Sequence, residues 1–164
     1  MNNCSQDIPG LCCHPARKVI SNFMHPVLIS ACLLGITCRY DQGSRPVPEL
    51  AEKLSNSHII PVCPEQLGGL PTPRPAAHIV GGDGFDVLEG KAGVFVRMDS
   101  DIKAGKDVTT QFVKGAEQCA MLARMFDVRR CYLKARSPSC GLSPVTGVTA
   151  ARLILSGLEV VEAG

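Results

Sequence analysis

Short apolar runs bounded by polar or turn-forming residues recur along the chain, a pattern typical of buried β-strands. They occupy residues 27–31 (VLISA), 58–62 (HIIPV), 130–135 (RCYLKA) and 158–161 (LEVV). Alternation within the third run places Cys131 and Leu133 on one face. The pattern therefore predicts four strands spread over the whole length of the chain.

Between these runs lie segments whose apolar residues recur at helical spacing. Residues 48–56 (PELAEKLSN) begin with proline, which the first turn of a helix favours. The clearest helix is predicted over residues 109–126, and another over residues 147–156, where Gly157 stops it. The 109–126 helix carries an apolar stripe that makes Cys119 a core residue, and this stripe consists of Phe112, Val113, Ala116, Cys119, Ala120 and Ala123.

The remaining segments are predicted from their turn-forming residues. Residues 64–75 are rich in proline and glycine, so we expect a rigid loop without helix or regular sheet. Short β-type pieces at 87–88 and 94–96 predict a hairpin. Residues 1–25 are polar and interrupted by proline and glycine, which predicts a mobile N-terminal extension, and a single domain is expected over residues 26–164.

The order of the predicted elements gives the fold class. Strands alternate with helices, and a hairpin is inserted after the second strand. This order implies a mostly parallel sheet with helices on its faces, joined by right-handed crossovers. We therefore predict an α/β protein, a small Rossmann-like three-layer sandwich.

Composition and charge narrow the range of partners. Aromatic residues make up only 4% of the chain and tryptophan is absent, so few side chains are available to stack on nucleic-acid bases. A net charge of +2 provides no extended basic surface for a nucleic-acid polymer or a membrane. No apolar run approaches the roughly 20 residues that cross a bilayer. Neither kind of partner is expected.

The nine cysteines are the most unusual feature of the composition. The N-terminus has no apolar segment typical of a secretion signal, so we expect a cytoplasmic protein with reduced thiols. No CxxC motif is present, which argues against thioredoxin-type chemistry and zinc-finger sites. Metal ligands, if any, must come from distant parts of the chain.

Three cysteines stand where predicted parallel strands end: Cys32, Cys63 and Cys140. Ligands of parallel α/β sheets bind beyond the carboxyl ends of the strands, so these thiols are expected at one edge. Thiolates suit iron–sulfur clusters, zinc and Cu(I), and three protein ligands leave a metal position open for catalysis. The alternative is that all three pack as small apolar groups.

Six motifs resemble those of a known family: SACLLGITCRYD, PVCPEQLGGLPTPRP, IVGGDG, GKDVTTQF, KARSPSCG and GVTAA. They occur in the family's order and span nearly all of the predicted domain. The family was long catalogued as a domain of unknown function and includes the TudS-like 2-thiouracil desulfurases. The chain is identified as a member by this resemblance.

The resemblance implies a [4Fe–4S] cluster held by Cys32, Cys63 and Cys140, with one open iron. It also implies a substrate, a thiolated uracil-type base or nucleoside. Water would replace the sulfur without net oxidation or reduction, and sulfide would be released. Cys38 lies in the first motif, but relatives carry other residues there, so it is not expected to be a ligand.

Proton transfer and activation of water require further residues. By resemblance Ser137 matches a serine implicated in relatives. Glu65 is the preferred carboxylate because it follows Cys63, and Asp41 is the alternative, which could equally be a turn residue. Three arginines near the cysteines could offset cluster charge or bind an oxygen, or form ordinary salt bridges and carbonyl contacts: Arg39, Arg74 and Arg136.

One departure from the family leaves the substrate open. Many members carry a longer segment between the SPSCG and GVTAA motifs, whereas here only LSPVT intervenes after Gly141. A more open pocket could admit a nucleoside, or activity could be lost. Two other functions therefore stay in view: a sulfur or persulfide carrier, and a non-catalytic module that binds a metal or nucleotide.

Overall fold

The structure is a computed structural model that describes residues 26–96 and 105–164. The predicted N-terminal extension, residues 1–25, lies outside the described residues. Within the described parts, no helix is long and apolar enough to cross a membrane.

Four parallel strands form the central sheet, in the order β2-β1-β5-β6. They are β1 (Val27–Ser30), β2 (Ile59–Val62), β5 (Arg130–Lys134) and β6 (Glu159–Ala163). All four predicted strands are present, with ends shifted by a few residues. The chain leaves β1 for β2 on one side and returns to the other side of β1 for β5. Such a reversal of strand order opens a crevice at the carboxyl ends of the strands.

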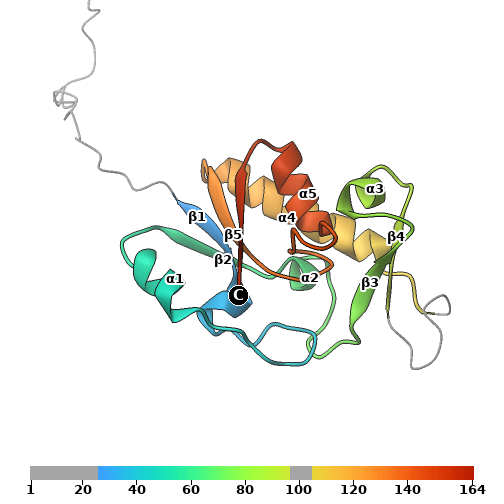
Figure 1. Ribbon diagram of the computed structural model, residues 1–164, viewed down its shortest axis with the longest axis horizontal. Coiled ribbons are helices and arrows are strands. Elements are labelled where there is room, and N and C mark those ends of the chain that lie inside the picture. The colour runs from blue at the N-terminus through green and yellow to red at the C-terminus, as the bar shows by residue number, and fades with distance from the viewer. Residues whose placement is uncertain (1–25, 97–104) are drawn as a thin grey trace, which may run out of the picture.

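Helices cover both faces of this sheet and complete three layers (Figure 1). Leu28 faces α4 (Thr109–Met125) and α5 (Val148–Leu155), whereas Ile29 packs with the layer formed by α1 (Pro48–Lys53) and the 3₁₀ helix η1 (Ala31–Leu34). Alternate residues of a strand point to opposite faces, which explains this division. The predicted mostly parallel three-layer sandwich is confirmed.

The core also confirms the predicted helical stripe. Cys119 is fully buried and packs in the cluster between the sheet and the α4–α5 layer. Phe112 near the start of α4 belongs to a third cluster, which joins this helix to the hairpin. The long helix α4 therefore connects the two hydrophobic clusters on its side of the sheet.

The hairpin is an antiparallel pair separate from the central sheet, formed by β3 (Ala77–Val80) and β4 (Gly93–Val96). The predicted strand at 94–96 is confirmed, but the predicted strand at 87–88 is wrong, because these residues lie in helix α3 (Gly84–Leu88). Asp83 and Asp86 form a capping box, and its hydrogen bonds start a helix at this point. The β-type side chains were thus overridden by local capping.

The expectation that residues 64–75 contain no helix is also wrong at their start. Helix α2 (Pro64–Leu67) follows β2 directly. Pro64 occupies the first turn, where a missing N–H costs no intrahelical hydrogen bond. The rest of the segment runs as a loop to β3 and passes beside the carboxyl edge of the sheet.

Candidate functional site

A cavity of about 380 Å³ lies at the carboxyl edge of the sheet. Its walls come from the segments that follow β1, β2 and β5, and from the end of the proline-rich loop. Four cysteines line it: Cys32, Cys38, Cys63 and Cys140. The structure thus brings together the three thiols that stood at strand ends in the sequence, and adds a fourth.

Cys32 is placed by the tight turn that ends β1. It lies in η1, and its carbonyl accepts the N–H groups of Gly35 at 3.3 Å and Arg45 at 2.8 Å. Gly35 ends the turn with a φ of 92°, a conformation that favours glycine. These hydrogen bonds fix the thiol of Cys32 at the carboxyl end of β1, where it is almost completely buried.

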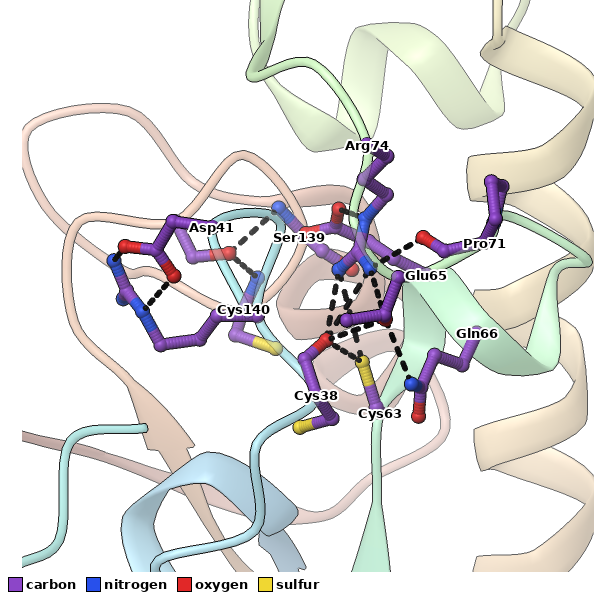
Figure 2. A network of polar contacts seen from close by, with 12 residues as sticks. Cys38, Asp41, Cys63, Glu65, Gln66, Pro71, Arg74, Ser139 and Cys140 are labelled. Atoms are coloured by element: carbon purple, nitrogen blue, oxygen red, sulfur yellow. Dashed lines mark hydrogen bonds and ion pairs between the residues drawn. The ribbon is translucent and has the colours of Figure 1, made fainter. Parts of the chain in front are cut away.

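Cys63 is placed by the junction between β2 and α2. Its carbonyl accepts the N–H of Leu67 at 2.9 Å, which makes it the residue that begins the helix. Its Sγ lies 3.5 Å from the carbonyl oxygen of Cys38 and 3.9 Å from Arg74 Nη2. The sulfur therefore meets two polar groups at the cavity wall, as Figure 2 shows.

Cys140 is placed by a loop that several groups hold. The hydroxyl oxygen of Ser137 accepts the N–H groups of Ser139 and Cys140, both at 3.2 Å. The carbonyl of Ser139 accepts two N–H groups of the first turn of α5, from Thr149 at 2.8 Å and Ala150 at 3.1 Å. Since these helix N–H groups have no partner inside the helix, α5 and the loop stabilise each other.

Glu162 on β6 holds the same loop from the other side. Its Oε1 accepts N–H groups from Leu142 at 2.8 Å, Ser143 at 3.3 Å and Arg136 at 3.4 Å. The hydrogen bond from Leu142 is the main reason that the pKa of Glu162 is lowered from its ordinary value of 4.5. The short segment after Gly141 is therefore anchored on a charged carboxylate.

The four thiols have different environments. Cys38 lies between Cys32 and Cys63, and a hydrogen bond from its thiol lowers the pKa of Cys32. Hydrogen bonding to Cys38, followed by burial, raises the pKa of Cys63 well above its usual value. Burial raises the pKa of Cys140 to about 12. Binding of a metal would have to displace the protons of Cys63 and Cys140.

Positive charge surrounds these thiols. Five cations line the cavity: Arg39, Arg45, Arg74, Lys134 and Arg136. Glu65 is the single acidic residue among the lining residues that the structure describes. A cationic wall favours the charged form of thiolates and of any anion bound with them.

The predicted catalytic residues are not equally close to the cavity. Glu65 and Ser137 line it, and Glu65 Oε2 pairs with Arg74 Nε at 2.6 Å. Asp41 does not line it: its carboxylate pairs with Arg39 at 3.0 Å and accepts the N–H of Gly43 at 3.0 Å. Arg39, mainly by hydrogen bonding, lowers the pKa of Asp41 to about 2. These contacts are those of a turn residue.

The donor set can be compared with the needs of different metal centres. In the described residues, no three His, Cys, Asp or Glu side chains converge on the position of one metal ion. A cluster of several irons does not need such convergence, because each thiolate binds a different iron. Three cysteines on separate loops around one cavity therefore fit a multi-iron cluster better than a single zinc ion.

Comparison with known proteins agrees with this geometry. The protein-family sequence model described as 2-thiouracil desulfurase matches residues 27–162, a range that includes all the loops lining the cavity. This chain belongs to the 2-thiouracil desulfurase family. The chain is 37% identical over 149 residues to the uncharacterized protein YbbK of Bacillus subtilis (strain 168). This match covers 83% of the desulfurase-family chain and 94% of YbbK.

The fold of this desulfurase-family chain also matches a solved structure. It is similar to the [4Fe–4S]-dependent thiouracil desulfidase TudS, with a TM-score of 0.68 and 33% sequence identity. The match covers 84% of this chain and 90% of that chain. The family resemblance drawn from the six motifs is thereby confirmed.

Cys38, which is not expected to be a ligand, lines the cavity, and its carbonyl oxygen accepts a hydrogen bond from the thiol of Cys63. One supporting residue of the site is not predicted from the sequence. Glu162 was not noticed, because its contact with the Cys140 loop depends on the pairing of β6 with β5. The final strand carries two acidic residues, Glu159 and Glu162, and nothing in the sequence singles out the second.

Proposed function

We propose that this protein is a [4Fe–4S]-dependent enzyme that removes sulfur from thiolated uracil-type bases or nucleosides. The observation that carries the proposal is the cavity at the switch point of the sheet, where Cys32, Cys63 and Cys140 come together from three loops. Family membership and the similarity to a [4Fe–4S]-dependent relative support it. The overall reaction converts a C=S group and water to a C=O group and hydrogen sulfide, without net oxidation or reduction.

The three cysteines would hold the cluster as thiolates. When bound, the cluster would supply a soft Lewis acid for the thiocarbonyl sulfur. Four thiols line the cavity, but Cys38 contacts the Cys32 and Cys63 thiols rather than standing alone on a strand end. We therefore keep Cys38 outside the ligand set and assign it no iron.

Ser137 can act as a hydrogen-bond donor to the substrate. Its oxygen already accepts two N–H groups, so its hydroxyl hydrogen is the part left to point into the cavity. A donor there would stabilise negative charge on a ring heteroatom or pass a proton to it. The same two hydrogen bonds hold the hydroxyl close to Cys140.

Glu65 is the better placed of the two carboxylates. It lines the cavity and is held by Arg74, whereas Asp41 is engaged in its own turn. As an ion-paired carboxylate, Glu65 would accept a proton from the attacking water and so act as the general base. Asp41 would act indirectly, by fixing Arg39 beside Cys32.

A cytoplasmic location completes the proposal. The six cysteines that the structure describes are free thiols, as a reducing compartment favours. The substrate would be a small molecule, because the cavity of about 380 Å³ would have to hold both the cluster and the substrate.

The decisive experiment is anaerobic reconstitution followed by a substrate assay. The full chain should bind iron and acid-labile sulfide and should release sulfide from 2-thiouracil or a thiouridine without added reductant. The absence of iron and labile sulfide would end the cluster hypothesis. A loaded protein that releases no sulfide from either compound would instead favour a sulfur carrier or a binding module.

A further inference from the structure

The side chain of Arg74 is the most enclosed charge at the site. Its relative exposure is 4%, and that of its partner Glu65 is 16%. A guanidinium so far from water must be compensated by hydrogen-bond acceptors, because an unpaired buried charge is strongly destabilising. Its acceptors therefore show what the arginine holds in place.

Arg74 binds helix α2, the loop that carries Cys38 and its own proline-rich loop (Figure 2). Its Nε donates to Glu65 at 2.6 Å, in α2. Both terminal nitrogens donate to the carbonyl of Cys38 at 3.2 Å, and Nη1 also donates to the carbonyl of Pro71 at 3.0 Å. The planar guanidinium thus joins the proposed base to the two loops that form this side of the cavity wall.

The same guanidinium reaches the sulfur of Cys63. Arg74 Nη2 lies 3.9 Å from this Sγ, whose own proton is directed at the carbonyl of Cys38. A cysteine that ligates iron has lost that proton, and its sulfur can then only accept hydrogen bonds. Arg74 is the cation already in contact with it.

We propose that Arg74 is a positioning residue that couples the Cys63 corner of the metal site to the carboxylate of Glu65. It does so by offering an N–H donor and a fixed charge to the sulfur while holding the carboxylate at a set place on the cavity wall. This inference rests on the proposed function, since it gives Cys63 and Glu65 their roles.

The fork geometry of arginine is essential to this coupling. A lysine at position 74 would keep the charge but could not reach Glu65, the Cys38 carbonyl and the Cys63 sulfur at once, because it is a point charge. A glutamine would lose the charge as well. The two substitutions therefore separate the contribution of charge from that of geometry.

The first test uses the full chain, reconstituted anaerobically. Arg74→Gln should weaken iron retention against a chelator by about 10- to 100-fold, as for other residues that support metal ligands. It should also shift the reduction potential of the remaining cluster to a more negative value, because positive charge and hydrogen bonds to sulfur favour the reduced form. Arg74→Lys should weaken retention but leave the potential closer to that of the wild type.

The matched control is Arg152→Gln. Arg152 also pairs with a carboxylate, that of Glu117 at 2.9 Å, but its side chain is 37% exposed and lies outside the cavity. This variant should keep wild-type retention and potential. Wild-type retention and potential in Arg74→Gln would overturn the proposal. Lower thermal stability with an unchanged potential would also overturn it, by reducing Arg74 to a structural role.

A second test does not depend on the cluster. Thermal unfolding of the cluster-free chain is compared for Arg74→Gln, Glu65→Gln and the double variant. If Arg74 holds Glu65, the fall in Tm of the double variant should be smaller than the sum of the falls in Tm of the two single variants. Additive losses would overturn the coupling. A wild-type chain that binds no iron while this coupling is present would refute the proposed function, but not the link between the two residues.

Discussion

The carboxylate of Glu162 offers a way to loosen the Cys140 loop without touching the cavity. It lies on β6 and accepts three N–H groups from the loop that follows β5. Glu162→Ala removes all three acceptor contacts at once, whereas Glu162→Gln keeps one neutral oxygen in the same place. The comparison therefore separates the charge from the hydrogen-bond acceptor.

The size of the effect follows from the distances. The bond from Leu142 is short, at 2.8 Å, whereas those from Ser143 and Arg136 are 3.3 and 3.4 Å and count for less. A hydrogen bond to a charged group contributes roughly 1.5–3 kcal/mol, and partial exposure reduces it. We expect Glu162→Ala to cost about 1–2 kcal/mol and Glu162→Gln about half as much. For a chain of this size that is a fall of about 2–8 °C in Tm for the alanine variant.

The effect should depend on pH in a defined direction. The folded pKa of Glu162 is lowered from 4.5, so its contribution to stability is fully present above that value. The contribution is lost as the pH falls through the folded pKa, and the wild type should then approach Glu162→Ala. Thermal unfolding followed by circular dichroism from pH 7 to about pH 3.5 measures this.

Glu159→Gln serves as the control, because this residue lies on the same strand but pairs with Arg130 in the solvent. It should change Tm little at any pH. If Glu162→Ala has the same Tm as the wild type at pH 7, the carboxylate does not anchor the loop. The same conclusion follows if the difference in Tm between the two proteins stays constant over the whole pH range.

Two further predictions concern the cysteines and the approach of α5. The three proposed ligands are Cys32, Cys63 and Cys140. Replacing any one of them with serine should abolish loading with iron and labile sulfide, as measured by metal and sulfide analysis. The control variants Cys38→Ser and Cys119→Ser should load normally. Full loading of Cys63→Ser would refute the ligand assignment. Gly147→Ala should lower Tm clearly, because its Cβ would lie 2.4 Å from the backbone of Ser139, and an unchanged Tm would contradict this packing.

The general place of the site could be predicted from the sequence. Apolar runs gave the four parallel strands, and the carboxyl ends of parallel strands share one edge. Cys32 and Cys63, directly after β1 and β2, were therefore expected at that edge. Cys140 lies further from the end of β5, and its loop brings it to the same cavity.

The supporting contacts could not be predicted in the same way. Salt bridges and carbonyl contacts could be expected for Arg74, but not which carbonyls it binds, because every residue type presents a main-chain carbonyl equally. The helices α2 and α3 were missed because one depends on proline at its first position and the other on a capping box. Both are local backbone effects, a fixed φ in one case and capping hydrogen bonds in the other, that outweigh the hydrophobic pattern.

The bond between Arg74 and position 38 has a consequence for sequence variation. The guanidinium binds the carbonyl of Cys38 and not its thiol. A side chain of similar size can therefore replace the thiol while the framework of the cavity wall stays intact. Because Cys38 is only 2% exposed and packs in the core cluster that contains Leu33 and Leu50, position 38 should vary among small side chains, and related chains can differ there without losing the contact to Arg74.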